Sequence, residues 1–334
     1  MTAARLSIRM GLQIPNFTYP GVGAADLFER IAAIAVAAEN NGFDSVFVMD
    51  HFYQLPMLGK PDQEMFEAYS LLTAIAARTS TVRLGAMVGG MTYRNPAYLA
   101  KTVTGLDVIS AGRAIWGIGA GWFEQEHDAY GFEFGTFTDR FEKLEEGLQI
   151  VTSMFTNHTT TFDGKWFKVT EAMNVPKPVQ PGGPPVLIGG SGERKTLRMV
   201  AQYADACNVF GEATAVRHLL GVLDGHCERL GRDPSTICRT RLGTLVVGRT
   251  MEAAEAKIAG RFGGAKLDDL PADVQARVRA MFILGDPPAV QAQVQTLLDA
   301  GLDGIVFNMP DAHDLEAVEL AGEVLRPVLG PVHD

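Results

Sequence analysis

The sequence predicts a single-domain α/β protein, a (β/α)8 TIM barrel with insertions that spans residues 1–334. Eight short apolar runs alternate along the chain with segments of helical periodicity. The runs are almost continuously apolar, which is typical of parallel strands covered on both faces. A glycine-rich turn that leads into a helix follows the fifth run, whereas a dinucleotide-binding fold would have it after the first. Such a barrel has its active site at the carboxyl ends of the strands.

The eight strands are expected at residues 8–14, 45–49, 82–88, 114–118, 185–188, 206–210, 240–247 and 304–308. Helices are expected between them, since apolar residues recur there with the helical period. In the first helix these residues are Leu27, Ile31, Ile34 and Ala38, which fall on one face. That face is expected to pack against the barrel.

Two insertions interrupt the alternation, at about residues 156–184 and 260–280. In the first, residues 159–168 alternate polar and aromatic side chains around Asp163-Gly164, which predicts a β-hairpin. In the second, residues 261–275 are polar and rich in glycine. Such a segment forms either a mobile lid or a surface insertion, and both interpretations stay open.

Composition narrows the class of protein. With 47% hydrophobic and 20% charged residues, the chain is expected to be globular. A formal net charge of -10 argues against a nucleic-acid partner, because such a partner requires clustered basic residues. No window is apolar enough to cross a membrane, and we expect a cytoplasmic protein. Cys207, Cys227 and Cys238 lack the spacing of metal ligands, as suits a reducing compartment.

The ends of the second to fourth strands carry candidate functional residues. The second ends at Asp50-His51, a pair that can exchange protons near neutral pH, although a solvated pair or a helix cap is an alternative. After the third, Gly89 and the following glycine predict a bulge or a close approach to a flat ligand. Beyond the fourth, Glu126-His127 has no further His or Cys at ligand spacing, so no metal site is expected.

The fifth strand leads into the glycine-rich turn. Gly189, Gly190 and Gly192 precede the predicted helix, whose first N–H groups would face a bound anion. This arrangement predicts a cradle for a phosphate group. The alternative is an ordinary turn whose glycines permit close packing.

Taken together, these motifs resemble the luciferase-like monooxygenase superfamily over nearly the whole chain. The match is most similar to its coenzyme F420-dependent oxidoreductases of actinobacteria. It rests on Asp50-His51, the segments 84–96, 112–122 and 140–148, the turn 189–192 and the ending 300–308. The resemblance implies a TIM barrel, commonly a homodimer, that holds a deazaflavin or flavin in its mouth.

The resemblance also implies roles for individual residues. Asp50 and His51 match the positions that contact the cofactor and the reacting substrate, and they are the expected catalytic residues. A cis peptide bond between Met87 and Val88, followed by Gly89, is implied behind the cofactor ring. The remaining positions implied to hold the cofactor are Gln125, Gly189, Gly190, Ser191 and Gly192, with Arg194 and Lys195 as charge partners for the phosphate.

Two departures from the family pattern bear on the substrate. The glucose-6-phosphate dehydrogenases of this family have a Glu where this chain has Trp122 and a Trp where it has Leu55, so oxidation of a sugar phosphate is not expected. Phe52, Tyr53, Leu55 and Trp122 predict an apolar substrate lining. Glu124 and Glu126 are reserve acids, but we expect both at a solvated helix start.

The predicted function is F420-dependent hydride transfer between the deazaflavin C5 and an apolar or conjugated small molecule. We expect a reduction, in which His51 or water supplies the proton. One alternative is a monooxygenase that uses reduced FMN, and another is a cofactor-binding protein without turnover. The retained Asp50-His51 pair argues against the latter, because a binding protein needs no proton donor.

Overall fold

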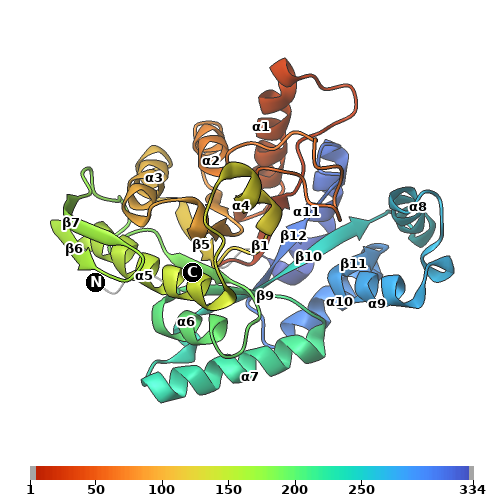
Figure 1. The fold of residues 1–334 in the computed structure, drawn as a ribbon. Helices are drawn as coiled ribbons and strands as arrows, with labels where there is room; N and C mark the ends of the chain where they lie inside the picture. Colours follow the sequence, from red (N-terminus) through yellow and green to blue (C-terminus); the bar gives the residue numbers. More distant parts are fainter. Residues whose placement is uncertain (1–4, 331–334) are drawn as a thin grey trace.

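The computed structural model describes residues 5–330 and shows a closed parallel barrel (Figure 1). Its strands pair in chain order, and β10 closes the barrel by pairing with both β9 and β12. All eight predicted strands are confirmed. The barrel strands are β1 (Met10–Ile14), β2 (Ser45–Val48), β3 (Arg83–Ala86), β5 (Ala114–Gly119), β8 (Val186–Gly189), β9 (Ala206–Val209), β10 (Cys238–Val247) and β12 (Gly304–Asn308).

Helices surround the barrel, and local side chains fix the first turns of several of them. Before α3, the Asn95 side chain accepts hydrogen bonds from two amides of the first turn. Before α5, Thr136 and Asp139 form a capping box. The helices are α1 (Ala24–Asn40), α2 (Ala68–Ala76), α3 (Pro96–Ile109), α4 (Glu124–Tyr130), α5 (Phe137–Thr156), α6 (Thr196–Tyr203), α7 (Ala213–Leu230), α8 (Met251–Arg261), α9 (Ala272–Met281), α10 (Pro287–Leu298) and α11 (Leu315–Leu329).

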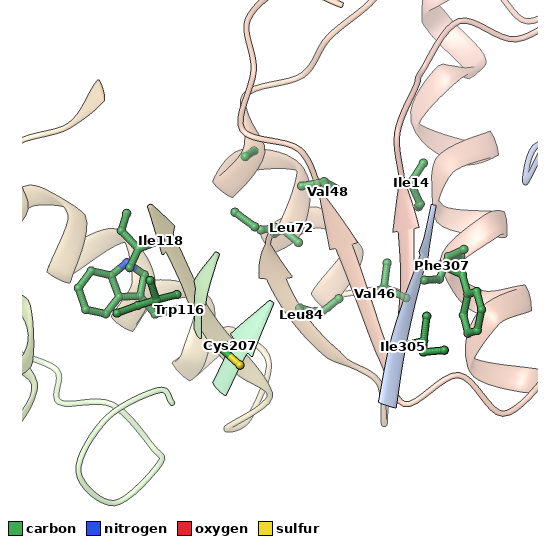
Figure 2. Close-up of a cluster of buried hydrophobic side chains, with 14 of the residues drawn as sticks. Ile14, Val46, Val48, Leu72, Leu84, Trp116, Ile118, Cys207, Ile305 and Phe307 are labelled. Atoms are coloured by element: carbon green, nitrogen blue, oxygen red, sulfur yellow. The ribbon is translucent and has the colours of Figure 1, made fainter. Parts of the chain in front are cut away.

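The barrel wall separates two apolar clusters. In β2, Val46 and Val48 point outward and pack beneath the helices, in the cluster that Figure 2 shows. Phe47 lies between them and points inward, where it meets Ile115 and Leu187 of other strands. Successive side chains of a strand point to opposite faces, so both faces are buried. This explains why the strand sequences are apolar throughout. The predicted face of α1 is buried too.

The two insertions lie on opposite sides of the barrel in Figure 1. The first contains the predicted hairpin, formed by β6 (Thr159–Asp163) and β7 (Lys168–Met173). The second contains α8, a 3₁₀ turn (Leu267–Asp269), α9 and the short strand β11 (Phe282–Gly285). The sequence analysis missed β11. It extends the sheet outside the barrel, because Thr244–Val247 of β10 pair with it where β9 has ended. Within residues 5–330, no helix is long and apolar enough to cross a membrane.

Candidate active site

The carboxyl ends of the barrel strands enclose a cavity of about 670 Å³. Every barrel strand contributes to its wall, so residues far apart in the sequence meet there. One contributor from each strand or the residues just after it, in chain order, is Gln13, Met49, Met87, Gly119, Gly189, Asn208, Leu242 and Asn308. The position agrees with the general location of active sites in (β/α)8 barrels.

A bulge after β3 forms the back of the cavity. The Met87–Val88 peptide bond is cis, as the sequence resemblance implied. The Val88 side chain fills space that Gly119 and Gly189 leave open: a Cβ at these positions would lie 3.1 and 2.9 Å from it. The side-chain amide of Gln13 donates a hydrogen bond of 3.0 Å to the backbone carbonyl of Met87. The glycines that end β5 and β8 therefore have a packing role.

Asp50 lines the cavity but is held by an arginine that the sequence analysis missed. The guanidinium of Arg94 donates to both Asp50 carboxylate oxygens, at 2.6 and 2.8 Å. The Gly90 amide donates to Asp50 as well. Arg94 also contacts Glu67 at 2.6 Å and lies over the ring of Tyr69. Because Asp50 is only 2% exposed, this charge pair is largely removed from water.

His51 is paired with Glu126 rather than with its neighbour Asp50. Its Nδ1 lies 2.9 Å from the Glu126 carboxylate. Glu126 also accepts hydrogen bonds from the Tyr93 hydroxyl at 2.7 Å and from the amides of Phe52 and Tyr53. Glu126 is fully buried, with 0% exposure. The expectation of a solvated Glu126 is therefore wrong: α4 turns this carboxylate toward the loop after β2.

The protonation states in this network follow from its hydrogen bonds. Burial alone would raise the pKa of Glu126, but hydrogen bonds from His51 and Tyr93 outweigh burial and lower it. Burial, and then the bond to Glu126, raises the pKa of Tyr93, which stays protonated. A carboxylate only accepts hydrogen bonds, so His51 Nδ1 carries a proton directed at Glu126. Its Nε2 remains available for exchange with a ligand.

Two of the four predicted substrate-lining residues line the cavity. Leu55 is buried in its wall, and Trp122 lies edge to face with His51 at 5.7 Å between ring centroids. Phe52 and Tyr53 do not line it, because their amides bond to Glu126 and their rings pack against Tyr130 of α4. Apolar lining residues that the sequence analysis missed are Met57, Leu58, Phe137, Phe141, Phe210 and Met281.

The predicted phosphate cradle joins β8 to α6. Gly189 and Gly190 line the cavity, but the Gly190 amide donates to the carbonyl of Asn208 at 2.9 Å. Among residues 5–330, the amides of Ser191, Gly192 and Glu193 have no acceptor. A Cβ at Gly192 would lie 2.8 Å from Thr196 Oγ1. These free amides lie in the turn before α6, and successive backbone N–H groups of this kind fit a phosphate group.

The other expected cofactor contacts lie outside the cavity wall. Gln125 and Arg194 are exposed and do not line it. Lys195 contacts Thr138 at 3.3 Å and lies over the rings of Phe137 and Phe141. Thr196, the first residue of α6, lines the cavity and was not singled out from the sequence.

His127 has structural partners. Its Nδ1 lies 2.8 Å from the carbonyl of Phe123, and its Nε2 lies 2.7 Å from the hydroxyl of Thr92. In the described part of the chain, no three His, Cys, Asp or Glu side chains are grouped to hold a metal ion.

Comparison with known proteins decides the family. Residues 8–304 match the profile of the family described as luciferase-like monooxygenase. The chain belongs to this family. The luciferase-like chain is 30% identical over 322 residues to an F420-dependent glucose-6-phosphate dehydrogenase of Kineococcus radiotolerans, with 90% of this chain and 93% of the relative covered. The resemblance seen in the sequence motifs is confirmed.

Solved structures share the luciferase-like barrel. A coenzyme F420-dependent tetrahydromethanopterin reductase from Methanopyrus kandleri superposes with a TM-score of 0.79 at 20% identity, over 96% of this chain and 99% of that chain. The oxygenating constituent of 3,6-diketocamphane monooxygenase from Pseudomonas putida, in complex with FMN, has a TM-score of 0.75 at 20% identity and the same coverage. At these identities the two similarities show the fold.

Proposed function

We propose that the protein is an F420-dependent oxidoreductase that reduces an apolar or conjugated small molecule. The observation that carries this proposal is the His51–Glu126–Tyr93 network. The Glu126 carboxylate is buried, and His51 and Tyr93, which bond to it, line a mainly apolar cavity. The curated relative named above is an F420-dependent enzyme, and the chain covers nearly all of it. When bound, the deazaflavin would supply a hydride from its C5.

The residues present fit the cofactor. The bulge at Met87 and Val88 offers a surface at the back of the cavity. The amides of Ser191 and Gly192 do not line the cavity, but they directly follow Gly190, which does, and they offer donors for a phosphate. We assign the tail of the cofactor to the segment 189–192. Gly189 has a second reason to be glycine, because a Cβ would collide with Val88.

His51 is the proposed proton donor. Glu126 fixes the imidazole through its Nδ1, so Nε2 is the nitrogen that can give a proton to the substrate. With an enone as acceptor, the bound cofactor would supply the hydride for the β-carbon and His51 would supply the proton for the α-carbon, so that the C=C bond becomes a saturated C–C bond. Asp50 positions the Gly90 backbone and holds Arg94 at the edge of the site.

The charge distribution favours a substrate without a phosphate group. Arg140 is the one lysine or arginine that lines the cavity in residues 5–330. Its guanidinium already donates to the carbonyls of Gly121 and Gly135, and it lies over the ring of Phe134. A phosphate needs several donors or cations, so the cavity suits a neutral molecule better.

Titration of the purified protein with F420 and with FMN under identical conditions tests the cofactor. We expect F420 to bind at micromolar concentrations or below, as measured by fluorescence. Binding of FMN without F420 would contradict the proposal and favour the alternative of a reduced-FMN monooxygenase, whose structural support is the shared fold of the FMN complex.

Turnover tests the chemistry. Reduced F420 with 2-cyclohexen-1-one should give oxidised F420 and cyclohexanone. His51→Ala should leave cofactor binding intact and slow turnover about 100-fold. Unchanged turnover would remove His51 from the mechanism, and F420 binding without turnover of any conjugated acceptor would favour a cofactor-binding protein.

We also propose a homodimer, on the basis of an exposed apolar surface beside the hairpin. Lys101 of α3 donates to the carbonyl of Val175, which connects the helix to the segment after β7. The exposed apolar side chains there are Tyr98, Val108, Ile109, Met173, Val175 and Val179. Exposed apolar side chains on neighbouring segments are typical of subunit interfaces. Sedimentation equilibrium should give twice the chain mass for the native protein and a monomer for Ile109→Asp.

A further inference from the structure

Beside the cavity, strand β10 changes its pairing partner from β9 to β11, and Arg241 lies at this change. The β10 strand pairs with β9 as far as Arg241 and with β11 from Thr244 onward. Leu242 and Gly243 lie between the two ladders, and both line the cavity. On this side of β10, the neighbouring strand is therefore β9 along the first part of β10 and β11 along the last part.

Arg241 is buried at this change of strand partner, and no carboxylate of residues 5–330 pairs with it. It is 2% exposed, and it points outward because Leu242, the next residue, faces the barrel interior. Its Nε and Nη2 donate to the carbonyls of Gly211 and Ala280, both at 2.6 Å. Its Nη1 has no hydrogen-bond partner among the described residues.

The site is shaped for this guanidinium. A Cβ at Gly243 would lie 2.6 Å from Arg241 Nη1, so any larger residue at position 243 would collide with the guanidinium in its present position. Burial lowers the pKa of Arg241 to about 10, and the group is still cationic at neutral pH. An apolar side chain of similar size would avoid the desolvation of a cation. Stability alone therefore does not account for an arginine here.

The two carbonyls adjoin residues of the cavity wall. Gly211 follows Phe210, and Ala280 precedes Met281 at the end of α9. Phe210 and Met281 both line the cavity. Within residues 5–330, Arg241 is the one side chain that hydrogen-bonds to both segments. Its two hydrogen bonds therefore fix the distance between two wall residues that come from different parts of the chain.

We propose that Arg241 is a positioning residue that sets the width of the cavity between Phe210 and Met281, and with it the size of substrate that the site accepts. Arg241 touches no reacting atom. It acts through the loop after β9 and through the end of the second insertion. The inference rests on the proposed function only in taking this cavity as the substrate site.

The first test measures backbone motion and needs no substrate. In Arg241→Met, amide hydrogen exchange of residues 216–217, in the first turn of α7, and of residues 281–283 should become faster by about tenfold or more, because the shared anchor is lost. Arg241→Lys, which keeps donors for the carbonyls, should restore part of the protection. The matched control is Arg239→Met on the same strand, which loses a pair with Asp224 outside the cavity. Unchanged exchange at both segments in Arg241→Met would overturn the proposal.

The second test measures substrate size with reduced F420, using 2-cyclohexen-1-one as the small acceptor and carvone as the bulky one. In Arg241→Met, the ratio of kcat/KM for carvone to that for cyclohexenone should rise about tenfold, mainly through KM. Met281→Ala removes the wall side chain directly and should raise the same ratio, even if the Arg241 variants fold poorly. An equal loss for both acceptors would contradict a role in cavity width. Failure of F420 turnover in the native protein would refute the proposed function and leave the exchange result to decide the role of Arg241.

Discussion

The wall after β2, β3 and β5 carries a saturated polar network, whereas the wall after β8, β9 and β10 carries free amides, glycines and apolar side chains. On the first wall, Glu126 accepts four hydrogen bonds and Asp50 accepts three. Beside the second, directly after the lining residue Gly190, the amides of Ser191 and Gly192 have no acceptor within residues 5–330. The groups that handle protons are thus held in place before any ligand arrives.

This difference follows from what each wall has to bind. A general acid must be oriented within a few tenths of an ångström, and its supporting residues provide that orientation through buried hydrogen bonds. Removing a partner from such a network leaves a buried charge unpaired, and this lowers the free energy of unfolding. A phosphate brings its own acceptors, and donors in an exposed loop are solvated until it binds. We therefore expect substitutions on the first wall to reduce stability or activity more than those on the second wall.

The largest effect is expected at Asp50. Asp50→Asn removes the charge that compensates the buried Arg94, and the free energy of unfolding should fall by about 3 kcal/mol in urea denaturation. Glu67 continues to face Arg94, which keeps the loss at the low end of the range for buried pairs. Glu29→Gln, which breaks the exposed pair with Arg78, should change stability little. Equal losses in the two variants would show that burial is not what distinguishes this wall.

Glu126→Gln should have the largest effect on turnover. The amide keeps the shape of the side chain but replaces one accepting oxygen with a donor, so it cannot accept all four hydrogen bonds and no longer fixes the His51 imidazole. The kcat should fall about 100-fold, or about 2.7 kcal/mol in activation free energy. Glu124→Gln, on the exposed face of the same helix, is the matched control and should be neutral. If both variants retain full activity, His51 needs no partner.

Gly192→Val should weaken cofactor binding without affecting the first wall. Its Cβ would collide with Thr196 Oγ1, and we expect roughly a tenfold higher Kd for F420, or about 1.4 kcal/mol. Gly221→Ala in α7, where a Cβ meets open space, is the control. An unchanged Kd for Gly192→Val would exclude this turn as the phosphate cradle.

The smallest effect is expected in acid. Because the pKa of Glu126 is lower in the folded protein, its stabilisation is present above the unfolded pKa and is lost as pH falls through the folded pKa. Between pH 5 and pH 3, the native protein should therefore lose more unfolding free energy than Glu126→Gln. A parallel decline of both proteins would indicate that Glu126 contributes no such dependence.

The barrel and part of the site were predictable from the sequence because their signals are local. Apolar runs marked the strands, and Leu55, Trp122 and Gly189 lie at the end of a strand or in the loop that follows it. The missed contacts join loops that are distant in the chain. Nothing near Glu126 indicates that α4 turns it toward His51, and nothing near Asp50 points to Arg94 as its partner. The strand β11 was missed because four residues beside a polar insertion carry too little periodicity.

The change of strand partner at Leu242 and Gly243 also bears on how such a barrel diverges. The second insertion joins the barrel through β11 and through the hydrogen bond from Arg241 to the carbonyl of Ala280, while the residues that handle protons come from the segments before α5. A change of length or sequence between Gly248 and Met281 therefore leaves the His51 network untouched. Recombination that replaces this segment would therefore change the substrate preference of the enzyme and leave its catalytic residues unchanged.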